Sequence, residues 1–64
     1  MDEKIKAQLE ILSTVLYQIE IEIEQIDRAI DRGEPFRELD AEKEALGRIY
    51  EWVQGIESDL EKKL

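Results

Sequence analysis

Large aliphatic residues recur at alternating steps of four and three through the first half of the chain. This spacing returns to one side of an α-helix every two turns, so it predicts a long helix with a single apolar row. Ile11 and Val15 lie beside the row, and we expect them to widen the apolar core. The row itself consists of Ile5, Leu9, Leu12, Leu16, Ile19, Ile23, Ile26 and Ile30.

A β-strand is the alternative interpretation of residues 18–25, where isoleucines alternate strictly with polar residues. The alternation is short, it lies inside a longer row of helical spacing, and no turn residue bounds it. Asp2 and Glu3 supply the negative charge that the start of a helix favours. The sequence therefore predicts an unbroken first helix over about residues 2–32.

The segment Arg32-Gly33-Glu34-Pro35 predicts a sharp reversal of the chain. Glycine readily adopts the left-handed conformation that follows a helix end, and proline suits the beginning of a new helix. A turn over residues 33–35 makes the two helices antiparallel neighbours, because so short a connection cannot carry the chain elsewhere.

The second helix is expected over about residues 36–63, with an apolar row that Glu42 interrupts. Glu42 is expected either at a frayed bundle end or as a polar residue that sets the register. Ala45 and Trp52 widen the apolar side on one flank of the row, and Tyr50 widens it on the other. The row consists of Leu39, Leu46, Ile49, Val53, Ile56 and Leu60.

Gly47 and Gly55 lie inside the second helix, where each costs about 1 kcal/mol of helix propensity relative to alanine. Close approach of a neighbouring helix would explain them, since glycine lets two backbones come near. Simple tolerance within a long helix is the alternative.

These patterns predict an all-α fold in which residues 1–64 form one antiparallel helical hairpin. A chain of 64 residues is near the lower limit for a self-sufficient core, and it holds no cysteine or histidine for a disulfide or a typical zinc site. Two helices cover each apolar row on one side only. We therefore expect a four-helix bundle, completed by homodimerisation or by docking on a helical partner.

The formal net charge of −8 narrows the range of partners that the chain could bind. No Lys or Arg occurs from Ala7 to Asp27, which argues against binding a phosphate backbone. No apolar run is long enough to span a membrane, the apolar side lacks a basic flank for lying on one, and no signal peptide is visible. A soluble, cytoplasmic protein that binds neither nucleic acid nor membrane is the expectation.

Candidate chemistry is sparse, and we expect neither an enzyme nor a cofactor or metal. Glu20 and Glu24, and likewise Glu38 and Glu42, are spaced to share a cation, but bundle metal sites normally add histidines. A solvated acidic surface explains both pairs. The pattern offers no general base to activate a hydroxyl, so nucleophilic catalysis is not expected. The hydroxyl residues besides the tyrosines are Ser13, Thr14 and Ser58.

Four residues are candidates for binding a partner. Tyr17 and Ile21 lie four apart on the side of the first helix opposite its apolar row, so we expect them to face water. Tyr50 and Trp52 lie on the two flanks of the second row. An incidental pair of exposed apolar residues is the alternative for Tyr17 and Ile21, because single ones are ordinary.

Several features resemble the YscE-like co-chaperones of type III secretion needle subunits, which are small helical hairpins. The first helix ends in Arg32-Gly33, and the second carries Ala45-Leu46 and later Asp59-Leu60, with Ile49, Val53 and Ile56 between them. The connection here is a few residues shorter than in that family. The resemblance implies a protein without activity of its own that pairs with a TPR-type chaperone and keeps the needle subunit soluble.

Two other families of short hairpins match less of the chain. The Rop-like plasmid regulators resemble it in length and in dimerising to a four-helix bundle, but they bind RNA through a basic and polar face that the first helix lacks. The Spo0E-like phosphatases share only Glu38-Leu39-Asp40 of their motif. A self-associating structural bundle, natural or designed, is the further alternative, although the helix-interior glycines weigh against idealised design.

Overall fold

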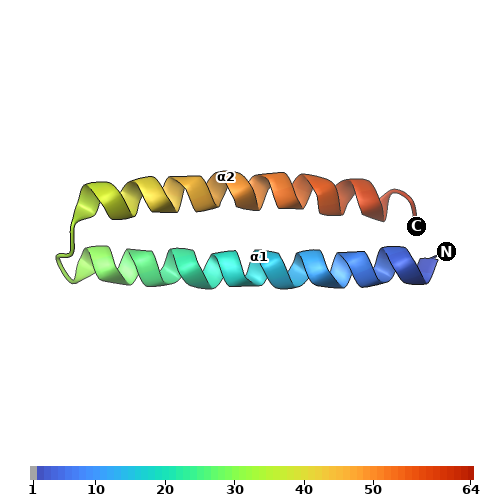
Figure 1. The fold of residues 1–64 in the computed structure, drawn as a ribbon, viewed down its shortest axis with the longest axis horizontal. Coiled ribbons are helices and arrows are strands. Elements are labelled where there is room, and N and C mark those ends of the chain that lie inside the picture. The colour runs from blue at the N-terminus through green and yellow to red at the C-terminus, as the bar shows by residue number, and fades with distance from the viewer. Residues whose placement is uncertain (1) are drawn as a thin grey trace.

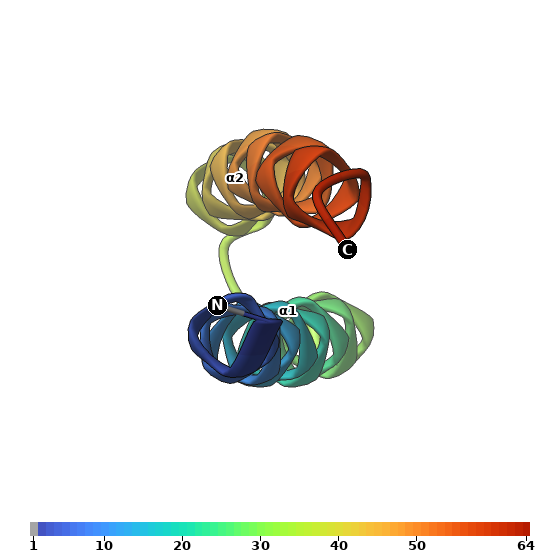
Figure 2. The ribbon, with the colours of Figure 1, turned by 90° about the vertical axis from the view of Figure 1, so that its right-hand side faces the viewer.

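The computed structural model describes residues 2–64 and shows two antiparallel helices joined by a short turn (Figure 1). Helix α1 spans Asp2–Asp31 and helix α2 spans Phe36–Glu61. They lie side by side along their whole length, and both termini lie at the end away from the turn (Figures 1 and 2). The predicted all-α hairpin is confirmed, and residues 18–25 are helical. Helix α2 ends two residues earlier than expected.

The turn is built as the sequence predicts. Gly33 has a φ of 87°, in the left-handed region that glycine adopts without strain. Its amide donates to the carbonyl of Ile30 at 3.0 Å, and the amide of Glu34 donates to the carbonyl of Ala29 at 3.2 Å. These two bonds form a Schellman motif, which satisfies carbonyls that the end of α1 would otherwise leave unpaired. Pro35 then precedes the first residue of α2.

The core lies in a single layer between the two helices. Every residue of the row predicted for α1 is buried or half-buried there, and so are Leu39, Leu46, Val53, Ile56 and Leu60 of the row predicted for α2. None of these side chains is fully enclosed, because a pair of helices covers each row from one direction only. The buried apolar side chains are Leu16, Ile19, Ile26, Ala29 and Val53.

Three residues expected in the core are exposed instead. Ile11 and Val15 do not widen the buried layer, and Ile49 does not belong to the row that faces α1. In α2 the inward row advances through Leu39, Leu46, Val53 and Leu60, seven residues apart, and Lys43, Tyr50 and Glu57 are among the half-buried residues between them. The prediction was wrong for Ile49 because the polar tips of Lys43 and Tyr50 reach acceptors on α1, so their positions turn inward in its place.

Glu42 and the two glycines can be judged from the same register. Glu42 is exposed and lies beside the inward row, so it neither interrupts the core nor sets the pairing of the two helices. A Cβ atom added at Gly47 or at Gly55 would meet no atom within 4 Å. Close packing of α1 against α2 therefore does not explain either glycine.

Candidate functional site

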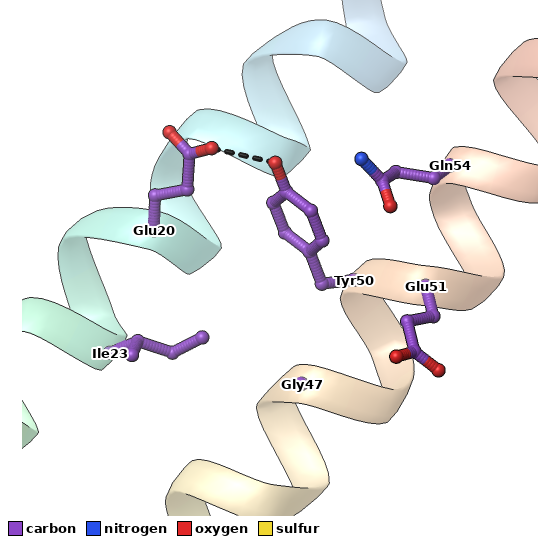
Figure 3. Close-up of a pocket in the computed structure, with 6 residues that line it drawn as sticks. All are labelled: Glu20, Ile23, Gly47, Tyr50, Glu51 and Gln54. Atoms are coloured by element: carbon purple, nitrogen blue, oxygen red, sulfur yellow. Dashed lines mark hydrogen bonds between the residues drawn. The ribbon is translucent and has the colours of Figure 1, made fainter.

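One long side of the hairpin is closed by polar contacts between the helices. The hydroxyl of Tyr50 donates to Oε1 of Glu20 at 2.6 Å (Figure 3). Nζ of Lys43 donates to Oδ1 of Asp27, also at 2.6 Å. We call these four residues the polar edge. They fix the register of the pair, since the two residue numbers add to 70 in both contacts.

The contacts of the polar edge change the acidity of their donors. The hydrogen bond to Glu20 raises the pKa of Tyr50 above its ordinary value of 10.0, and partial desolvation and the nearby carboxylates act in the same direction. The hydrogen bond to Asp27 and its negative charge raise the pKa of Lys43. Both donors therefore stay protonated at neutral pH, and the polar edge remains closed.

A shallow hollow of about 450 Å³ lies beside Tyr50 (Figure 3). The missing side chain of Gly47 leaves this space open, and Ile23 lines its apolar part. Glu20 already accepts the Tyr50 hydroxyl, and none of the six lining residues is a serine, threonine, cysteine or histidine. The hollow offers apolar surface with carboxylates beside it, and no pair of groups for nucleophilic catalysis.

The opposite long side is apolar and open to solvent. Ile11 is 63% exposed and Trp52 is 69% exposed, and Val15 and Ile49 are also exposed. Ile11 of α1 and Ile56 of α2 line one hollow of about 330 Å³ together with Leu12, Leu60 and Gln8. Ile11 and Ile56 therefore lie on the same long side of the hairpin. Val15 lies one turn from Ile11, and Trp52 and Ile49 lie one and two turns from Ile56. We call Ile11, Val15, Ile49, Trp52 and Ile56 the apolar face.

The middle of the apolar face carries little charge. On α1, the positions that share the side of Ile11 and Val15 are the uncharged Gln8 and Gln18, and charge returns only at Lys4 and Glu22. The other large exposed apolar residues are Tyr17, Phe36 and Leu64. Tyr17 lies at least about 120° around α1 from Ile11 and Val15. Phe36 is the first residue of α2, and Leu64 lies beyond the last one. The apolar face is therefore a distinct surface.

No family model matches the chain, and no curated protein or solved structure matches it significantly. The YscE-like resemblance accordingly stays a prediction.

The structure separates the four residues expected to bind a partner. Tyr17 is exposed as predicted, whereas Ile21 is half-buried and does not face water fully. Tyr50 belongs to the polar edge, and Trp52 lies on the opposite side in the apolar face. The four residues do not form one surface.

Sequence reasoning missed the apolar face because it assigned Ile11, Val15 and Ile49 to the core. The available signal was the second row of α2, in which Ala45, Ile49, Trp52 and Ile56 repeat the four-three spacing one position away from Leu46, Tyr50, Val53 and Glu57. Two adjacent rows with helical spacing indicate a helix that packs on two sides.

The acidic pairs proposed from spacing are engaged in other contacts or lie open. Glu20 accepts the Tyr50 hydroxyl, and Glu24 pairs with Arg28 at 2.7 Å. Glu38 and Glu42 are exposed. Within residues 2–64, no three histidine, cysteine or acidic side chains are grouped to hold a metal ion, and neither helix is long and apolar enough to cross a bilayer.

Proposed function

We propose that this chain is a non-enzymatic interaction protein that binds amphipathic helices through the apolar face. The observation that carries the proposal is the contrast between the two long sides of one small hairpin. Hydrogen bonds close one side, whereas the other leaves large side chains of both helices in water. Exposed apolar surface concentrated on one side of a small protein is typical of an interaction site.

Helices are the partners that suit the shape of the apolar face. Its residues follow helical spacing, and the hollow between Ile11 and Ile56 can accept a side chain from a helix laid along the hairpin. Two partner helices packed there would complete a four-helix bundle. A co-chaperone role of the kind that the YscE-like resemblance implies, with a TPR-type chaperone as partner, would use the same surface.

Site-specific photocrosslinking in the cells that make the protein tests this proposal. A photoreactive phenylalanine analogue at position 52 should crosslink to a protein segment of helical periodicity, either of this chain or of another. The same analogue at position 17 is the matched control, because Tyr17 and Trp52 are aromatic residues of similar exposure on different sides. No product from position 52, or equal products from both positions, would contradict the proposal.

A further inference from the structure

We propose that a second copy of this chain covers the apolar face, with the two hairpins antiparallel about a two-fold axis perpendicular to the helices. The result is a four-helix bundle whose turns lie at opposite ends. This inference rests on the proposed function, since it names the occupant of the same surface. Exposed area, the position of the face and the charges along it support it.

The exposed area is too large for a self-sufficient monomer. The chain exposes 5131 Å², whereas a folded monomeric protein of 7.5 kDa exposes about 4,200 Å². The excess of about 900 Å² is close to the roughly 800 Å² that each partner buries in a standard interface. The radius of gyration of 14.8 Å also exceeds the roughly 11 Å of a compact chain of this length. One further hairpin removes a surface of the required size.

The apolar face is centred along the hairpin, so it can pair with itself. The register of the polar edge places Trp52 level with Gln18, and Ile49 level with Ile21. The face therefore extends from the level of Ile11 to about the level of Ile21, around the middle of α1. A two-fold axis through this middle superposes the face on its copy, which makes the contact self-complementary and closed.

Charges at the two ends of the face favour the antiparallel arrangement. Lys4 lies seven residues before Ile11 on α1, and Lys63 follows the end of α2, so both lysines place positive charge at the open end of the hairpin. Glu42 lies seven residues before Ile49, and Glu38 lies one turn further toward the turn end. Antiparallel hairpins bring the lysines of one copy to the glutamates of the other. Parallel hairpins bring like charges together, which is unfavourable.

Sedimentation equilibrium of the purified chain tests whether a second copy is the occupant. We expect a dimer at micromolar concentration and at least a ten-fold larger dissociation constant for Trp52→Glu. Tyr17→Glu, the matched control, should associate like the wild type. If Trp52→Glu does not fold, the milder Ile11→Gln provides the same comparison. A wild-type monomer at all accessible concentrations, or equal weakening by Tyr17→Glu, would overturn the proposal.

A distance between two spin labels tests the orientation. The chain holds no cysteine, so Arg37→Cys gives one label per copy near the turn. At 1.5 Å per residue, antiparallel hairpins place the two labels about 50 Å apart. A distance below about 30 Å would show parallel hairpins and overturn the antiparallel assignment.

Charge reversal gives an independent test of the same arrangement. Two double variants each reverse the charge at one end of the face: Lys4→Glu with Lys63→Glu, and Glu38→Lys with Glu42→Lys. Either double variant alone should weaken self-association several-fold. Mixing the two doubly substituted chains should restore dimers, because every end contact is then between opposite charges. Parallel hairpins predict instead that neither double variant associates more weakly than the wild type.

The outcomes separate this inference from the proposed function. A purified chain that stays monomeric while position 52 crosslinks to a different protein leaves the proposed function standing and refutes the second copy. A purified monomer without any crosslink at position 52 refutes both.

Discussion

The two long sides of this hairpin carry side chains at nearly the same spacing, but these side chains end in different surroundings. On the polar edge, Tyr50 and Lys43 lie along the helix junction and end in hydrogen bonds to acidic residues of α1. On the apolar face, Ile49 has no polar tip that could pair with α1, and Ile49 and Trp52 stay exposed to water. The comparison shows that amphipathic side chains can close a two-helix junction alone, whereas purely apolar side chains need a second layer. Substitutions on either side, and in the core between them, test this contrast.

The largest effect is expected in the core that both sides share. Leu16→Ala should lower the free energy of unfolding by about 2–5 kcal/mol, because it removes a buried side chain and leaves a cavity. Urea denaturation followed by circular dichroism measures this loss. Tyr17→Ala is the neighbouring control and should cost far less, because Tyr17 is exposed. Equal losses at both positions would mean that the buried side of α1 is assigned wrongly.

A smaller loss is expected on the apolar face, and it should depend on protein concentration. Ile49→Gln should lower stability by about 1–2 kcal/mol per chain where the face is covered by a second copy, since apolar area is then no longer buried. Thermal unfolding at several protein concentrations checks this. A loss that stays the same on dilution would place the contribution of Ile49 within the single hairpin.

A gain in stability is expected beside the polar edge. Gly47→Ala should raise the free energy of unfolding by about 0.5–1 kcal/mol, because alanine favours helix and its Cβ meets no atom within 4 Å. Gly33→Ala should instead destabilise the fold, since its φ of 87° is strained for alanine. Denaturation of both variants tests the pair. A loss of stability in Gly47→Ala would show that the hollow beside Tyr50 is occupied.

The smallest effect is expected from the titration of the polar edge. Because folding raises the pKa of Tyr50 and of Lys43, their contribution is complete below their ordinary values of 10.0 and 10.5 and is lost as the pH rises through the folded-state pKa values. The melting temperature should therefore stay constant near neutral pH and decrease in the alkaline range. Tyr50→Phe should show a shallower alkaline fall, and an identical profile would mean that this hydrogen bond contributes nothing.

The sequence was sufficient for the helices and the turn, because these depend on local chemistry. The four-three spacing located the buried row of α1, and Gly33 and Pro35 located the turn. The polar edge and the apolar face were beyond the same reasoning. Tyr50 and Ile49 are adjacent and both largely apolar, and which one turns inward depends on the acceptor that Glu20 provides from the other helix. That preference is set by tertiary contact.

The Schellman turn also has a consequence for the order in which the hairpin folds. It holds the end of α1 and the start of α2 within a few residues of each other, so contacts near Gly33 close the shortest loops and lose the least chain entropy. Pairing of the helices should start there and proceed toward the two termini like a zipper. Amide hydrogens of the cross-helix segments should then exchange more slowly near the turn than near Ile5 and Leu60. Gly33 thus determines where folding begins as well as where the chain reverses.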